Sequence, residues 1–139
     1  MISFQAEGVE MPDIDIARTN RWLVGVASGY DRLIGTLNYV FSDDEKILET
    51  NRNFLNHDYY TDIITFDYST GNRVGGDIII SLDTVKSNAR EYAVSFEDEL
   101  HRVIVHGLLH LCGLKDKTLE ERREMEAAED KALDNLKDI

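Results

Sequence analysis

The spacing of apolar residues along the chain alternates between a period typical of strands and one typical of helices. Short runs rich in Val, Ile, Leu and Tyr predict four strands, at residues 2–6, 33–41, 61–68 and 77–81. Apolar positions three and four residues apart predict five helices, at residues 12–29, 42–55, 82–92, 95–113 and 118–136. This order of elements predicts an α+β fold, in which one mixed four-stranded sheet is packed with helices.

Hydroxyl side chains mark three of the predicted helix starts. Ser42 is followed three residues later by Glu45, and Thr118 is followed in the same way by Glu121. This is the spacing of a capping box, in which the two side chains bind each other's backbone amides. Ser95, with acidic residues behind it, opens the helix over 95–113.

Composition narrows the class of protein. The 139 residues suit one domain, spanning 1–139, and an apolar fraction of 42% is enough for a core. The single cysteine, Cys112, excludes an internal disulfide and fits a reducing compartment. We find no secretory signal and no apolar run near the roughly 20 residues of a membrane span. A cytoplasmic protein without a membrane partner is therefore expected.

The net charge of −12 argues against a nucleic-acid-binding protein that works by bulk charge, because phosphate contacts need Lys and Arg. It leaves room for a local basic patch, and no DNA partner is expected. Acidic residues concentrate at 43–45 and 120–130, which we interpret as solvent-facing helix surface.

The stretch H-G-L-L-H at residues 106–110, followed by Asp116, carries the candidate chemistry. Histidines four apart on a helix project from the same face and can bind one metal ion. Gly113 can end the helix and turn the chain back, so that Asp116 supplies a third ligand. The helix is otherwise strongly apolar, and buried histidines need polar partners, which also favours a metal.

Three protein ligands leave one coordination position open, which is typical of a catalytic zinc site rather than a structural one. A carboxylate as third ligand widens the choice toward harder divalent ions. A peptidase of this type carries Glu directly after the first histidine as its general base. Here that residue is Gly107, which argues against peptidase chemistry.

Four further residues lie near the two histidines in the sequence or can approach them. Cys112 lies about 200° around the helix from His110 and is expected in the core, and His101 is also expected to face elsewhere. Arg102 lies one turn before His106, so it either contacts a substrate phosphate as a catalytic residue or forms a surface ion pair. His57 can approach the metal from a loop.

Three segments together resemble the YbeY family of bacterial metal-dependent endoribonucleases, also called rRNA maturation factors. Residues 106–116, H-G-L-L-H-L-C-G-L-K-D, resemble the family signature H-G-x-L-H-L-x-G-Y-D-H. Residues 51–54 and 61–66, N-R-N-F and T-D-I-I-T-F with Asp58 between them, resemble its L-N-x-x-Y-R…D…T-D-V-L-S-F stretch. Residues 76–81, G-D-I-I-I-S, resemble its G-D-I-x-I-S stretch.

The resemblance implies a zincin-like α+β fold, one zinc ion and cleavage of single-stranded RNA. It also implies work in ribosomal RNA processing and ribosome quality control, with small-subunit ribosomal RNA as the main target and the ribosome as a partner. His106 and His110 carry over as metal ligands.

The chain departs from the family pattern at two positions. Asp116 stands where the signature has its third histidine, and Leu55 stands where the family has an arginine. That arginine is a candidate RNA contact. Five cations are possible substitutes for it: Arg73, Lys86, Arg90, Arg102 and Lys115.

Acids in the matching segments are candidates for a supporting or proton-transferring role. The sequence does not distinguish between Asp58, Asp62 and Asp77, and Asp77 is equally a candidate structural hydrogen-bond acceptor. Two alternative functions stay open. One is a metal-dependent hydrolase of another substrate, and the other is a ribosome-associated RNA-binding protein with a non-catalytic metal site.

Overall fold

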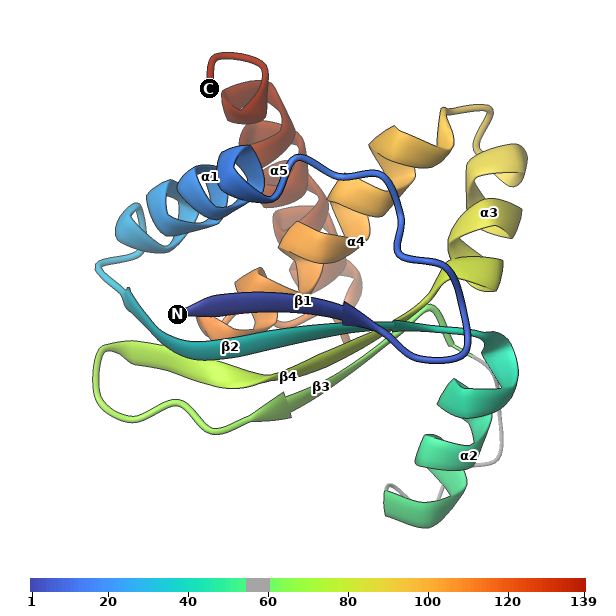
Figure 1. Ribbon diagram of the computed structural model, residues 1–139. Helices are drawn as coiled ribbons and strands as arrows, with labels where there is room; N and C mark the ends of the chain where they lie inside the picture. Colours follow the sequence, from blue (N-terminus) through green and yellow to red (C-terminus); the bar gives the residue numbers. More distant parts are fainter. Residues whose placement is uncertain (55–60) are drawn as a thin grey trace.

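A four-stranded mixed sheet forms the centre of the structure, a computed structural model that describes residues 1–54 and 61–139 (Figure 1). The strands are β1 (Ile2–Ala6), β2 (Leu33–Ser42), β3 (Ile63–Asp67) and β4 (Arg73–Ser81). They lie in the order β1-β2-β4-β3, in which β1, β2 and β4 are parallel and β3 is antiparallel to β4. The predicted mixed sheet is confirmed, and β3 lies at one of its edges.

The described ranges contain five helices: α1 (Ile16–Ser28), α2 (Asp44–Phe54), α3 (Leu82–Glu91), α4 (Phe96–Leu111) and α5 (Leu119–Leu136). Figure 1 shows α1, α4 and α5 on the same side of the sheet, while α2 extends to the other side. Helix α4 contacts α1, α3, α5, β3 and β4, so it is fixed from several directions. No helix in the described ranges is long and apolar enough to cross a bilayer.

The core lies between the sheet and these helices. Tyr39 and Phe41 in β2, and Ile78 and Ile80 in β4, are fully buried on the helix-covered face. The Tyr39 hydroxyl donates a hydrogen bond to the carbonyl oxygen of Ile104 in α4 at 2.8 Å. A buried phenol needs such a partner, and this one ties α4 to the middle of the sheet.

The opposite face of the sheet is partly polar. The Asn38 side chain donates to a carboxylate oxygen of Asp77 at 3.0 Å and accepts from the Ser3 hydroxyl at 2.6 Å. These residues lie side by side on β1, β2 and β4. Asp77 therefore has the structural role that was one of its two predicted possibilities, away from the helix-covered face.

Gly107 sets the distance between α4 and the sheet. A Cβ atom at this position would lie 2.9 Å from Cδ1 of Ile78 and 3.0 Å from Cδ1 of Ile63. Real Cβ contacts are rarely this short, so a side chain here would require the two isoleucine side chains or the helix to shift. Close packing against the sheet thus explains why position 107, between the two histidines, is glycine.

Several element boundaries differ from the prediction, and the differences at α1, α2 and β4 have a clear physical reason. Helix α1 begins at Ile16, because the side chain of Asp15, not the Pro12-Asp13 pair, accepts the Arg18 amide as N-cap. The Ser42 capping box was wrong: Ser42 belongs to β2, and Asp43 accepts the Lys46 amide at 2.8 Å.

Strand β4 begins at Arg73, four residues earlier than predicted, because pairing with β2 extends through the glycines at 75 and 76. The caps at Ser95 and Thr118 are confirmed, the second as a full capping box with Glu121.

Candidate metal centre

Helix α4 presents His106 and His110 one turn apart, and the chain then turns back toward them. The helix ends when the amides of Gly113 and Leu114 bond to carbonyl oxygens of its last turn. Gly113 has φ +106°, a backbone conformation that L side chains rarely adopt. The turn carries Asp116 back beside the helix, as the sequence predicted.

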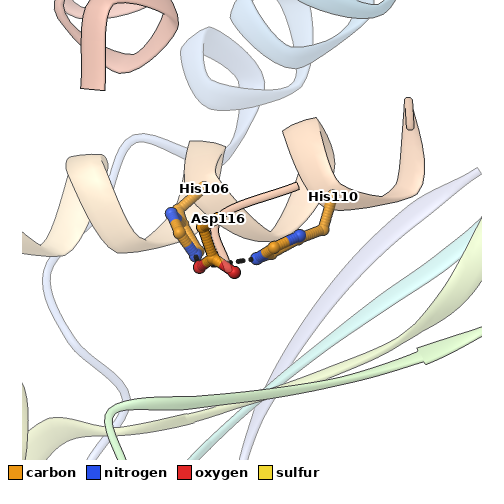
Figure 2. A group of neighbouring side chains, drawn as sticks. All are labelled: His106, His110 and Asp116. Carbon is orange, nitrogen blue, oxygen red and sulfur yellow. Dashed lines mark hydrogen bonds and ion pairs between the residues drawn. The ribbon is translucent and has the colours of Figure 1, made fainter. Parts of the chain in front are cut away.

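Three side-chain atoms converge at this point. One carboxylate oxygen of Asp116, Oδ2, lies 3.4 Å from Nε2 of His106 and 3.2 Å from Nε2 of His110. Figure 2 shows both rings and the carboxylate pointing into the same space below α4. All three side chains are partly buried, and ligand atoms of the three lie within 4.8 Å of one another.

The other nitrogen of each ring already has an acceptor. Nδ1 of His110 lies 3.0 Å from the carbonyl oxygen of Leu114, which can only accept, so Nδ1 carries the proton. Nδ1 of His106 lies 2.6 Å from Oε2 of Glu129. In the neutral rings, both Nε2 atoms are therefore left with lone pairs that point toward Asp116.

This donor set fits a divalent metal ion. The two nitrogen lone pairs and the carboxylate oxygen that they face repel one another unless a cation lies between them. For bonds near 2.1 Å, a tetrahedral site separates neighbouring ligand atoms by about 3.4 Å, close to the separations found here. The residues present therefore fit a divalent metal ion at this position.

Buried carboxylates set the electrostatics around His106. Burial lowers the pKa of His106, but the hydrogen bond and charge of Glu129, together with the charges of Asp62 and Asp116, outweigh burial and raise it. A raised pKa means that protons compete with a metal for this ring as the pH falls.

Asp62 is the acid from the matching segments that interacts with the site. Burial raises the pKa of its carboxyl group, and the charge of His106 partly opposes this. Of the other two candidate acids, Asp77 is bound to Asn38, and Asp58 lies outside the described residues. The predictions for Leu55 and His57 lie outside them as well.

Arg102 forms ion pairs with two acids of α5. Its guanidinium lies 2.8 Å from Oε1 of Glu129 and 2.6 Å from Oδ1 of Asp130. Of the two possibilities that the sequence left open, the structure contains the ion pair. A contact with a substrate phosphate stays a prediction.

Cys112 lies in the core, as predicted, and His101 faces away from the metal centre, as predicted, and is buried as well. The His101 ring packs edge-on against Trp22 with 5.7 Å between ring centroids, and burial lowers its pKa. Cys112 is buried, and burial raises the pKa of its thiol to about 11.

A groove of about 1150 Å³ runs along α4 and α5 from His106 and Asp116 toward Leu136. Eight acidic side chains line it, against four Lys and Arg. Such a lining disfavours a polyanion along most of the groove. Of the cations proposed as substitutes for the family arginine, Lys115 is exposed in the loop that also carries Asp116, whereas Lys86 and Arg90 lie on α3.

Glu129 is the residue of the site that the sequence did not reveal. It lies in the acidic run at 120–130, which was interpreted as solvent-facing, but only 7% of its surface is exposed. That interpretation was wrong for this residue. The available signal was its spacing, because Glu129 falls on the same helix face as the buried Met125, Ala132 and Leu136.

Comparison with known proteins gives consistent matches over nearly the whole chain. The family model described as Endoribonuclease YbeY matches residues 2–137. Proteins named Endoribonuclease YbeY from Bacteroides fragilis and Phocaeicola vulgatus are 57% and 58% identical over 132 and 133 residues. These matches cover 95% and 96% of this chain and the same shares of the two relatives.

A solved structure gives the same result at the level of the fold. The solution structure of a Thermotoga maritima protein superposes with a TM-score of 0.65 at 26% sequence identity. The match covers 98% of this chain and 89% of that protein. The fold described above is therefore shared between distant relatives.

Proposed function

The chain belongs to the YbeY endoribonuclease family, and from this premise we propose that it cleaves single-stranded RNA with the help of a bound divalent metal ion. We place this activity in ribosomal RNA processing, chiefly of the small-subunit RNA, and in ribosome quality control. The observation that supports the proposal best is the convergence of two imidazole Nε2 atoms on Asp116, with each Nδ1 atom held by its own acceptor.

His106, His110 and Asp116 are the proposed metal ligands, with zinc as the expected ion and other divalent ions compatible with the carboxylate. A bound ion would supply Lewis acidity toward a phosphoryl oxygen and would acidify a water molecule. Among the described residues, these three form the one group of acids, histidines and cysteine close enough to share an ion. Three ligands leave room for water or substrate, as hydrolysis requires.

Asp62 is the proposed proton-handling group beside the metal centre. Its partial burial keeps the pKa of its carboxyl group above the ordinary value, which suits a group that takes up and releases a proton. A peptidase would have its general base at position 107, where the residue is glycine and an added Cβ atom would already lie 2.9 Å from the Ile78 side chain. This supports RNA over peptide as the substrate.

Lys115 and Arg102 are the two candidates for a contact with the RNA backbone. Lys115 is exposed and directly precedes the ligand Asp116, so it can contact a phosphate next to the scissile bond. Arg102 is a second candidate, although its present ion pairs would have to open first. DNA is not an expected substrate.

Residues 1–139 are proposed to act as a single domain in the cytoplasm, with the ribosome as the setting of the reaction. The near-complete coverage of relatives of similar length supports a single functional unit.

The proposal predicts linked losses of metal and of RNA cleavage. Purified wild type should contain about one equivalent of divalent metal and should cleave single-stranded RNA in a chelator-sensitive way. His110→Ala and Asp116→Ala should lose both, whereas Asp116→His should retain metal because histidine is an equally good ligand. Metal content by elemental analysis and a gel assay on labelled RNA measure the two properties.

Three outcomes would contradict parts of this proposal. Cleavage that persists in His110→Ala would show that the metal centre does not cut RNA. Bound metal without RNA cleavage would favour a ribosome-associated RNA-binding protein. Chelator-sensitive cleavage of peptides in place of RNA would favour the alternative function, a metal-dependent hydrolase of another substrate.

A further inference from the structure

Glu129 is a buried acid held between two residues of α4. Its Oε2 lies 2.6 Å from Nδ1 of His106, and its Oε1 lies 2.8 Å from the guanidinium of Arg102. The residue comes from α5, 23 positions beyond His106 in the chain. Both carboxylate oxygens therefore have a defined partner on the neighbouring helix.

Packing alone does not explain an acid at this position. The neighbouring positions of the same face, Met125 and Ala132, are apolar and buried. Burying a carboxylate costs free energy that an apolar side chain of similar size would not cost. The site compensates this cost with the charge of Arg102 and the ring of His106, which points to a role in the arrangement of those groups.

The hydrogen bond fixes which nitrogen of His106 is available. A carboxylate accepts the proton of Nδ1, so the lone pair remains on Nε2, the atom that faces Asp116. A negative partner on the far nitrogen also makes the imidazole a stronger donor to a metal. For His110 the same task falls to the backbone oxygen of Leu114, within the local turn.

Arg102 limits what Glu129 itself can do. Because Arg102 binds Oε1, the carboxylate keeps only Oε2 for His106 and is held back from the space between the two rings. If the Glu129 carboxylate became a fourth ligand, it would occupy the coordination position that hydrolysis needs for water or substrate. Asp130 binds the other end of the guanidinium at 2.6 Å and holds Arg102 in place.

We propose that Glu129 is a positioning residue of the metal centre: it orients His106 through Nδ1 while Arg102 keeps it from becoming a ligand. The inference rests on the proposed metal site. It makes α5 part of that site, although none of the three proposed ligands lies on α5, and it gives Arg102 a task other than binding phosphate.

The test compares zinc affinity in wild type, Glu129→Gln and Glu129→Met, measured by competition with a chromophoric chelator on the folded protein. Both variants should bind zinc about 10–100-fold more weakly, the usual effect of removing a partner of a metal-bound histidine. Glu124→Gln is the matched control: it removes the same charge from an exposed position of α5 and should bind zinc as wild type does.

A second measurement separates positioning from simple helix docking. Nitrogen NMR of the metal-free protein at alkaline pH should show His106 protonated on Nδ1 in wild type and a mixture of tautomers in Glu129→Met. A purely structural role predicts a lower unfolding temperature in EDTA for the variants but unchanged zinc affinity, and that result would overturn the inference.

Two further results bear on Arg102 and on the premise. Arg102→Gln should also weaken zinc binding. Unchanged zinc affinity with a raised KM for RNA would overturn its role in holding Glu129 and make it a substrate contact. Wild type that binds no zinc would overturn the metal site and this inference together, whereas wild type that binds zinc no better than Glu129→Gln would overturn the inference alone.

Discussion

Single residues decide the chemistry of this protein, and the two proposed histidine ligands differ in how they are held. His110 relies on a backbone oxygen four residues away, so its orientation follows from the local turn at Gly113. His106 relies on the side chain of Glu129, so its orientation follows from the packing of two helices. The family signature, residues 106–116, includes the backbone partner of His110 but does not include Glu129, the partner of His106.

The raised pKa of His106 makes a prediction about stability in the absence of metal. A raised folded-state pKa contributes stability that is fully present below the ordinary histidine pKa of about 6.5 and is lost as pH rises through the folded value. In EDTA, the unfolding free energy of wild type relative to His106→Gln should therefore fall as the pH rises above about 6.5. Urea titrations of both proteins across this range measure the difference.

The comparison of wild type with His106→Gln cancels an opposing pH dependence that comes from His101. His101 has a lowered pKa, so it contributes stability that is lost as the pH falls, but it is present in both proteins. With excess zinc, the wild-type trend should reverse, because protons no longer compete for the ligands at higher pH. A wild-type trend in EDTA that matched His106→Gln would contradict the assigned environment of His106.

At the scale of elements, the metal centre depends on how closely α4 lies on the sheet. Gly107 permits that approach, and Gly113 ends the helix where the chain must turn back. Gly107, the glycine of the H-G-L-L-H stretch, therefore has two consequences. It excludes a peptidase-type general base, and it brings α4 against Ile63 and Ile78.

Replacing Gly107 by alanine should destabilise the protein despite the better helix propensity of alanine. The new Cβ would meet Ile78 at 2.9 Å and Ile63 at 3.0 Å within a packed interior. Overpacking of this kind costs about 1–3 kcal/mol, and the propensity gain of about 1 kcal/mol offsets only part of it. We expect a net loss of roughly 1 kcal/mol in denaturant unfolding.

Gly25 in α1 provides the matched control. A Cβ there meets nothing within 4 Å, and the position is exposed. Gly25→Ala should therefore stabilise the protein by about 0.5–1 kcal/mol. Equal effects of the two substitutions would show that the contact at Gly107 is not tight.

At the scale of the whole molecule, an acidic protein must meet an acidic substrate. The net charge is −12, and the groove beside the metal centre is lined by more acids than bases. Long-range repulsion should slow the association of RNA at low ionic strength, so we expect productive binding to depend on a few local cations such as Lys115.

Neutralising distant acids should therefore improve RNA binding at low salt. The triple variant Glu120→Gln, Glu124→Gln and Glu126→Gln removes three exposed charges from α5 and changes the net charge from −12 to −9. Its KM for single-stranded RNA should fall a few-fold at low salt. At about 0.5 M salt the Debye length is a few ångströms, and the difference should vanish.

Lys115→Ala should have the opposite effect on KM. Losing one phosphate contact to single-stranded RNA should reduce the salt slope of binding by about 0.7. Lys131→Ala, an exposed position on α5, is the control and should leave the slope unchanged.

The prediction for the triple variant has its own contradicting outcome. A KM for the triple variant that equals that of wild type at every salt concentration would show that bulk charge plays no part.

Most interactions between neighbours in the chain could be predicted from the sequence alone, although the capping box at Ser42 was wrong because β2 extends through that residue. Periodicity predicted each of the nine elements in the described parts of the chain, and the caps at Ser95 and Thr118 followed from spacing, because a cap joins residues three apart. The convergence of His106, His110 and Asp116 was predictable for the same reason, since one helical turn and one glycine turn connect them.

Only the tertiary structure decided which partners come from elsewhere in the chain. Glu129 and Asp130 reach Arg102 across 27 and 28 residues, and the position of β3 at the sheet edge depends on a crossover. An acid on a helix has the same local pattern whether it faces water or a neighbouring helix. The packing of α5 against α4 makes that choice, and it turns a residue expected at the surface into the partner of a proposed metal ligand.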